Sequence, residues 1–206
     1  MRTRLQEDSV DNDRAAGRTG QQTGEHVLGA VEDGTHQPAA FVHRLDRETA
    51  GVVIFSHNIE TRGKYQSMFQ KRVVKKVYEA LAGPIEGREF PFTYRSRMQD
   101  AAQFFVSEEV PGEPNSETLI EMIERRGDVV RYRLHPHTGR KHQLRLHLSS
   151  LGAPILNDAF YPVALPCKGD DFSAPLQLLA RSISFADPLT GEQRTFTSER
   201  TLDWPG

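Results

Sequence analysis

The chain has 206 residues, 37% of them hydrophobic, which is enough for one globular domain with its own core. Its single cysteine excludes an intramolecular disulfide, and no apolar run approaches the roughly 18 residues of a membrane-spanning helix. The first residues also lack the apolar segment of a secretory leader. Composition therefore predicts a cytoplasmic protein that has no membrane partner.

The net charge of −2 is distributed unevenly along the chain. Residues 1–40 contain four arginines and seven carboxylates and show no sustained hydrophobic period, which is typical of an acidic, mobile N-terminal arm. We expect residues 41–206 to form the folded domain. Its cations fall in short clusters, at 71–72, 75–76, 125–126, 131, 133 and 140–141. These clusters indicate either a basic surface for nucleic acid or the solvated faces of strands and helices.

Residues 43–51, with the sequence HRLDRETAG, place a carboxylate between two arginines. Asp46 has Arg44 on one side and Arg47 on the other. A carboxylate with cations a few ångströms away stays ionised and keeps a depressed pKa, which suits a nucleophile or an electrostatic stabiliser. The alternative is a surface loop whose charges pair with one another. The apolar residues 52–55 that follow predict a strand.

The middle of the chain predicts one helix and several strands. The helix is expected at 58–72, and the strands at 76–81, 103–106, 118–124 and 129–134. Asn58 is the candidate N-cap of the helix, and residues 86–100 show no clear period. In the last strand three apolar residues alternate with Arg131 and Arg133, which predicts one buried face and one cationic face.

Residues 138–152 predict a second helix, which Thr138 caps and Gly152 ends. Its leucines fall on one stripe and three cations on a neighbouring one, so one face packs and the next presents positive charge. The three cations are Lys141, His142 and Arg145. The free N–H groups of the first turn, together with Arg140 and Lys141, form a candidate phosphate-binding site. Two more strands are predicted near 176–185 and 194–196.

The histidines do not have the spacing of a metal site. His142 and His147 are five residues apart on the predicted helix, about 140° around its axis, so they cannot share a metal ion. The sequence also contains no Gly-rich phosphate loop, nucleophile elbow or paired cysteines. We therefore expect no metal and no cofactor. A metal-dependent hydrolase that uses the eight histidines is an alternative function, the third besides the two given below.

Four motifs, in order, resemble those of the RluA family of pseudouridine synthases. Residues 43–51 are similar to its H-R-L-D-x-x-T-S-G motif, with Ala50 where serine is usual. Residues 76–80 (KVYEA) resemble its K-x-Y-x-A strand, and residues 137–147 (HTGRKHQLRLH) resemble its T-G-R-x-H-Q-I/L-R-x-H segment. Residues 152–158 (GAPILND) match its G-x-P-I-x-G-D motif except at Asn157.

The resemblance implies an α+β fold with a mixed, mainly antiparallel sheet, flanking helices and a central active-site cleft. It also implies isomerisation of uridine in RNA, either rRNA or tRNA, to pseudouridine. By position Asp46 is the nucleophile, Tyr78 the ring that lies against the base, and Arg145 the ion-pair partner of Asp46. Arg44 matches the arginine that fills the space left by a flipped base. We expect RNA to bind at Arg44 and at the cationic segment Arg140, Lys141 and His142.

The sequence departs from the family pattern at its N-terminus. Residues 1–40 contain no N-K-P-x-G segment, so the family's N-terminal strand is missing or is replaced by part of this arm. The candidate replacement is residues 25–31. No S4-type RNA-binding domain is expected, and no obligate protein partner is inferred. The alternative function is a non-catalytic RNA-binding or folding protein derived from this family. Asp46, Tyr78 and Arg145 together argue against it, because binding alone does not need a nucleophile.

Overall fold

The structure is a computed structural model that describes residues 40–56, 58–102, 105–165 and 171–205. The acidic arm expected at 1–40, with its candidate strand at 25–31, therefore lies outside the described residues except for Ala40.

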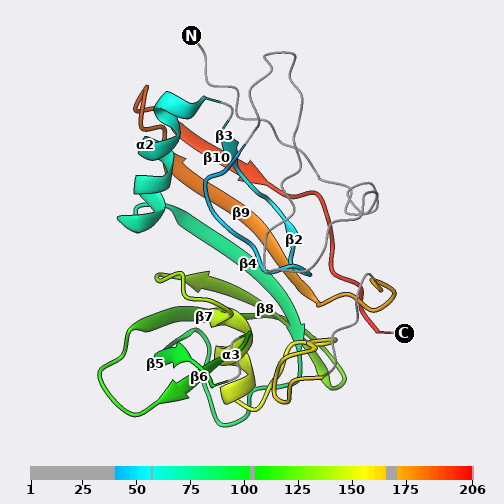
Figure 1. Cartoon of the computed structure of the whole chain (residues 1–206). Helices are drawn as coiled ribbons and strands as arrows, with labels where there is room; N and C mark the ends of the chain where they lie inside the picture. The colour runs from blue at the N-terminus through cyan, green and yellow to red at the C-terminus, as the bar shows by residue number, and fades with distance from the viewer. Residues whose placement is uncertain (1–39, 57, 103–104, 166–170, 206) are drawn as a thin grey trace.

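An eight-stranded sheet forms the body of the domain (Figure 1). Its strands are β2 (Ala50–Gly51), β4 (Lys75–Ala82), β5 (Phe92–Asp100), β6 (Ser107–Val110), β7 (Ser116–Arg126), β8 (Val129–Pro136), β9 (Leu178–Ala186) and β10 (Gln193–Thr197). The strand order is β10-β9-β4-β8-β7-β5-β6, and β2 pairs with β9 outside this path. β2 is parallel to β9, whereas the other described pairings are antiparallel. The mixed, mainly antiparallel sheet expected from the family resemblance is confirmed.

Two helices of the described chain, α2 (Ile59–Gln70) and α3 (Gln143–Ser150), flank this sheet. Asn58 caps α2 as predicted, because its side-chain oxygen accepts a hydrogen bond from the Glu60 N–H at 2.8 Å. α2 packs on the β9 and β10 half of the sheet, where Tyr65 meets Phe185 edge-on. α3 packs against β5, β6 and β7.

The strand predicted at 52–55 is wrong for residues 52–54, and only Phe55 lies in a strand. The chain instead forms a separate two-stranded sheet from β1 (Ala40–Phe41) and β3 (Phe55–Ser56). Gly51 explains the break, because its φ is +111° and a Cβ there would lie 2.2 Å from the carbonyl oxygen of Ala180 in β9. The backbone thus makes one close approach to β9 and then leaves the large sheet.

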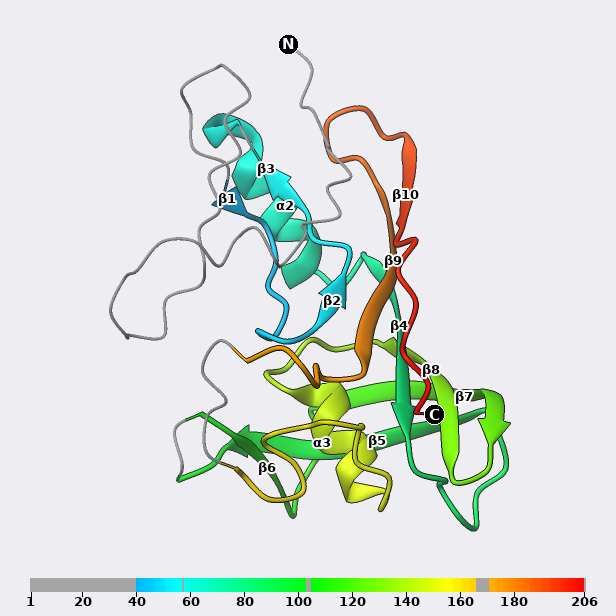
Figure 2. The ribbon, with the colours of Figure 1, turned by 90° about the vertical axis from the view of Figure 1, so that its right-hand side faces the viewer.

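β4 is shared by the two halves of the large sheet. It pairs with β9 over residues 75–80 and with β8 over residues 78–82. Figure 2 shows β9, β10 and α2 on one side of β4 and β5 to β8 with α3 on the other, with a strong twist between them. The register of β4 on β9 shifts between Val77 and Tyr78, so a β-bulge lies next to Tyr78.

Most predicted elements are confirmed, with bounds that differ by a few residues. They are the helix at 58–72 and the strands at 76–81, 118–124, 129–134, 176–185 and 194–196. The pattern missed β5, because Ser96 occupies an inward position between Tyr94 and Met98 and interrupts the apolar alternation. The strand predicted at 103–106 is also wrong for its described residues, since β6 begins one residue later.

Candidate active site

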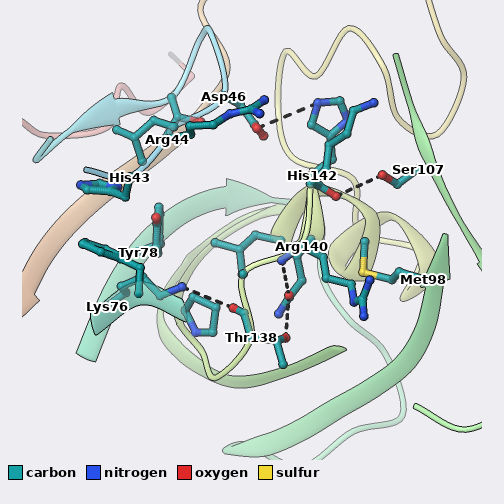
Figure 3. A pocket seen from close by; sticks show the side chains of 18 of the residues that line it. His43, Arg44, Asp46, Lys76, Tyr78, Met98, Ser107, Thr138, Arg140 and His142 are labelled. Atoms are coloured by element: carbon teal, nitrogen blue, oxygen red, sulfur yellow. Dashed lines mark hydrogen bonds and ion pairs between the residues drawn. The ribbon is translucent and has the colours of Figure 1, made fainter. Parts of the chain in front are cut away.

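A cleft of about 730 Å³ lies beside β4, between the two halves of the sheet (Figure 3). Six of the seven predicted site residues line it: Arg44, Asp46, Tyr78, Arg140, Lys141 and His142. The seventh, Arg145, lies behind the cleft surface and is 5% exposed. The fold therefore brings residues from three separate motifs to one place.

His43 fixes the segment that carries Asp46. Its Nε2 accepts a hydrogen bond from the Ile54 N–H at 3.1 Å, and its ring stacks on Phe69 with centroids 4.7 Å apart. Burial, and then the charge of Lys76, lower the pKa of His43 to about 4, so the ring is neutral at physiological pH. The sequence motif contained His43, but its anchoring role depends on contacts across the fold.

The carboxylate of Asp46 faces Arg145 and His142 from the opposite wall of the cleft. Its Oδ2 lies 3.5 Å from Nη1 of Arg145, and its Oδ1 lies 3.9 Å from Nε2 of His142. The expected flanking by Arg44 and Arg47 is not the source of these two contacts. Both side chains are exposed, and the Arg47 guanidinium lies 5.6 Å from the ring centroid of Phe172. The partner that the family motif implied for Asp46, Arg145, is within ion-pair distance.

Arg145 is held in place by Asp158, a residue that reasoning from sequence did not select. Nε and Nη2 of Arg145 donate to the two carboxylate oxygens of Asp158 at 2.8 and 2.5 Å. Asp158 has a fully buried side chain and also accepts N–H groups from Phe160 and Tyr161. Burial alone would lower the pKa of Arg145, but the hydrogen bond and charge of Asp158, followed by the charge of Asp46, raise it. This bidentate pair leaves Nη1 directed to Asp46.

The G-x-P-I-x-G-D resemblance contained the only signal for Asp158. Asn157 occupies the position where the family has glycine, and its φ is +64°. Asparagine tolerates this left-handed conformation better than most residues, so the turn that delivers Asp158 to Arg145 is retained. The side chain of Asn157 also donates to the Pro175 carbonyl at 3.0 Å.

His142 connects the cleft to a buried tyrosine. Its Nδ1 lies 3.2 Å from the hydroxyl of Tyr161, which accepts the N–H of Ser107 at 2.8 Å. Burial lowers the pKa of His142, whereas the charge of Asp46 opposes that shift. A neutral imidazole at this position is a polar neighbour of Asp46 that can contact a bound base.

The start and the cationic face of the second predicted helix are wrong. α3 begins at Gln143, and His142 occupies its N-cap position with φ +54°. Thr138 does not cap it, because its hydroxyl accepts the Glu117 N–H and donates to Oε1 of Gln143. Lys141 and His142 therefore belong to the preceding loop, and Arg145 is buried rather than presented to solvent. Gly152 follows the helix with φ +77°, as its predicted role at the C-terminus requires.

Gln143 holds the loop that presents Arg140 and Lys141. Its Oε1 accepts the Arg140 N–H at 3.1 Å, and its amide donates to Glu117 O and Thr118 Oγ1, both at 3.0 Å. An N–H group expected to meet phosphate is thus already paired within the loop. Phosphate binding by Arg140 and Lys141 remains a prediction.

Tyr78 and Lys76 occupy the same face of β4 and both line the cleft. Burial, and then the charge of Asp46, raise the pKa of Tyr78 well above its usual value, so it is a neutral phenol. Burial, and then the charge of Arg72, lower the pKa of Lys76. The motif K-x-Y thus places a neutral ring and a half-buried ammonium side by side.

The cationic face predicted for β8 is only partly correct. Its apolar residues Val130, Tyr132 and Leu134 are buried, and its arginines alternate with them. Arg131 and Arg133, however, form ion pairs with Glu124, Glu79 and Glu121. This strand therefore presents a network of both charges rather than a basic surface.

The described residues show neither a metal cluster nor a membrane helix. No three His, Cys, Asp or Glu side chains among them converge as ligands. None of the helices in this part of the chain is long and apolar enough to cross a bilayer. His147 uses both ring nitrogens inside the protein, with Nε2 2.9 Å from Ser116 Oγ and Nδ1 3.0 Å from Thr118 Oγ1.

An aspartate paired with an arginine in the cleft of a mixed sheet, with a tyrosine on the adjacent strand, is the site expected of a pseudouridine synthase. The sequence profile of the RNA pseudouridylate synthase family matches residues 17–150, so the chain belongs to this family and is an RNA pseudouridine synthase. The match begins inside the predicted arm, in residues whose structure is not described.

Individual relatives agree with this family. The dual-specificity RNA pseudouridine synthase RluA of Pasteurella multocida is 34% identical over 164 residues, 76% of this chain and 71% of that protein. Its counterpart from Haemophilus influenzae is 31% identical over 165 residues, with the same coverage. The tRNA pseudouridine synthase C of Vibrio vulnificus is 29% identical over 193 residues, 86% of this chain and 79% of that protein.

Solved structures share the fold. Human RNA pseudouridylate synthase domain containing 1 superimposes with a TM-score of 0.66 at 26% identity, covering 79% of this chain and 69% of that one. Human RNA pseudouridylate synthase domain containing 4 gives a TM-score of 0.64 over 86% of this chain and 78% of that one, at 24% identity. The predicted family and fold class are both confirmed.

Proposed function

We propose that this enzyme isomerises a specific uridine of tRNA or rRNA to pseudouridine with Asp46 as the nucleophile. The observation that carries the proposal is the position of the Asp46 carboxylate, which lines the cleft and is held 3.5 Å from Nη1 of the buried Arg145. An ionised carboxylate with one fixed cationic partner stays available to attack an electrophilic carbon.

The reaction is balanced without a cofactor. Asp46 adds to C1′ of the ribose or to C6 of the base, and the N1–C1′ bond breaks. The base rotates, C5 bonds to C1′, and the bond between Asp46 and carbon breaks, which restores the free carboxylate. C5 loses a proton and N1 gains one. Product and substrate have the same atoms, so no oxidant, reductant or co-substrate is consumed.

Tyr78 and Arg44 are proposed to position the extruded base and to fill the space that it leaves. Tyr78 is a neutral ring on the cleft face of β4, where it can lie against a uracil. Because stacking hides the reacting atoms inside a helix, the target nucleotide must be extruded into the cleft. Arg44 is exposed at the cleft rim, beside Asp46 in Figure 3, and we assign it to the space that the extruded base leaves.

Cations on the loop after β8 are proposed to bind the RNA backbone. Arg140, Lys141 and His142 line the cleft, and Nε of Arg140 is tied to the Asn115 carbonyl at 3.0 Å. The choice of tRNA or rRNA is supported by relatives that are named as a tRNA pseudouridine synthase and as dual-specificity RNA pseudouridine synthases.

The test is incubation of the purified protein with unmodified tRNA and rRNA transcripts, followed by mapping of pseudouridine at single-nucleotide resolution. We expect a discrete set of modified uridines, all of which disappear with Asp46→Asn. RNA binding without any pseudouridine in either RNA would instead support the non-catalytic alternative.

A further inference from the structure

Lys76 differs from the other buried or half-buried cations around the cleft in its lack of a carboxylate partner. Arg145 pairs with Asp158 and Lys141 with Asp100. Among the residues that the structure describes, no carboxylate lies within ion-pair distance of the Lys76 ammonium. Its protein contact is a long hydrogen bond of 3.4 Å from Nζ to the Thr138 carbonyl. Two of its three N–H donors thus have no acceptor among the residues that the structure describes.

Gly139 keeps the space around this ammonium open. A Cβ at Gly139 would lie 3.3 Å from Nζ of Lys76, closer than most side-chain contacts, and both residues line the cleft. The absence of a side chain at position 139 therefore leaves room for another group beside Nζ.

Arg72 adds a second cation at the same place. It lines the cleft and, with burial, lowers the pKa of Lys76. Arg72 follows the C-cap of α2 with φ +57°, a conformation in which glycine is the usual residue. Position 72 therefore carries an exposed cationic side chain where glycine would be the least strained residue.

The groups facing Lys76 are therefore neutral or positive. They are His43 and Tyr78, which are both neutral, the Thr138 carbonyl, and Arg72. Such a position disfavours a bare ammonium and becomes favourable when an anion binds.

We propose that Lys76 and Arg72 form a phosphate-binding subsite for the phosphodiester next to the uridine that enters the cleft. Lys76 lies two residues before Tyr78 on the same face of β4, a separation of roughly 7 Å. That spacing puts the ammonium one backbone step away from a base resting on Tyr78. The inference rests on the proposed function, since it assumes that a uridine occupies the cleft.

The test measures binding of small probes to the full chain by calorimetry or NMR titration. The probes are uridine, uridine 3′-monophosphate, uridine 5′-monophosphate and inorganic phosphate. We expect at least one monophosphate to bind about tenfold or more tightly than uridine, and Lys76→Met to remove that advantage while uridine binding stays unchanged. Lys76→Arg should retain it, and Arg72→Asn, which tolerates the left-handed backbone, should reduce it.

Lys75→Met is the matched control, because Lys75 is exposed and lies on the other face of β4. It should bind the monophosphates as the unsubstituted protein does. With a single-stranded RNA, Lys76→Met should reduce the slope of log affinity against log salt concentration by about 0.7. Thermal melting of each variant checks that it is folded.

Equal monophosphate affinity in Lys76→Met and the unsubstituted protein would overturn the subsite, and so would inorganic phosphate binding as tightly as the nucleotides. These outcomes are independent of whether pseudouridine forms. A protein that modifies no RNA but loses monophosphate affinity in Lys76→Met would refute the proposed function and leave the subsite standing.

Discussion

The two walls of the cleft treat positive charge in opposite ways. On the α3 side Arg145 is buried and makes a bidentate pair with Asp158, so its position is set before substrate arrives. On the β4 side Lys76 and Arg72 have no carboxylate within ion-pair distance among the described residues. A cation that orients a nucleophile needs fixed geometry, whereas a cation that binds a diffusible anion must keep its donors free. Under the proposed function, this difference separates residues that support chemistry from residues that bind substrate.

Loss of the proposed nucleophile, which the Arg145 wall orients, should have the largest effect. Asp46→Asn keeps the shape of the side chain but removes its charge, so pseudouridine formation should fall by on the order of a thousandfold or more. Asp100→Asn is the matched control, because Asp100 also lines the cleft but is exposed and pairs with Lys141. Pseudouridine yield from the same RNA gives the comparison. Appreciable turnover in Asp46→Asn would remove Asp46 from the mechanism.

Removal of Arg145 tests whether its buried ion pair with Asp158 also stabilises the fold. Arg145→Met leaves the fully buried Asp158 carboxylate without a cation and should lower the free energy of unfolding by about 3–5 kcal/mol. The exposed pair between Arg95 and Glu117 provides the control, because Arg95→Met should cost less than about 1 kcal/mol. Urea denaturation of both variants measures the difference. Similar losses in the two variants would contradict a role of the buried pair in stabilising the fold.

Buried histidines should also make the free energy of unfolding depend on pH. Burial lowers the pKa of His147 from 6.5 to about 4. As pH falls, His147 is therefore protonated near pH 6.5 in the unfolded chain but only near pH 4 in the folded chain. Stability is therefore highest above pH 6.5 and falls by about 3 kcal/mol on this account as pH drops to 4. His43, with a pKa of about 4, acts in the same direction.

His147→Gln should flatten that part of the stability profile, as measured by urea denaturation between pH 4 and 7. His137→Gln is the control, because the His137 side chain is 70% exposed. It should leave the profile unchanged. A profile equally steep in His147→Gln would assign the pH dependence to other groups.

Substitution of a single cation on the loop after β8 should have the smallest effect, which is on RNA affinity. Arg140→Gln should weaken RNA binding by a few-fold to about tenfold and reduce the salt slope by about one, because a single phosphate contact is lost. Arg131→Gln is a suitable control, since Arg131 pairs with Glu124 on β8. Filter binding over a range of salt concentrations measures both. A slope unchanged in Arg140→Gln would exclude Arg140 from the backbone contacts.

Sequence patterns predicted elements whose burial is simple and missed those where polar groups point inward. β8 was predictable because Tyr132 and Leu134 alternate with arginines, whereas β5 was not, because Ser96 faces inward to bond His147. The start of α3 was misplaced for a similar reason. Gln143 engages the Thr138 hydroxyl that would otherwise cap a longer helix.

The site shows the same division. Asp46, Tyr78 and Arg145 were predictable because family motifs mark them, and the structure brings them together. Asp158 was present in those motifs, but its role depends on its contact with Arg145. The role proposed for Lys76 depends on the lack of a carboxylate partner among the described residues. Periodicity and spacing contain no record of such long-range pairing.

The continuity of β4 through both halves of the sheet limits how the enzyme can move. Its residues are hydrogen-bonded to β9 on one edge and to β8 on the other. The two halves of the sheet therefore cannot move apart like hinged domains without breaking hydrogen bonds between strands. The cleft should therefore change little in width during a catalytic cycle. The RNA must therefore change its conformation to enter the cleft. This requirement favours modification of uridines in loops or bulges, where unstacking costs the least free energy.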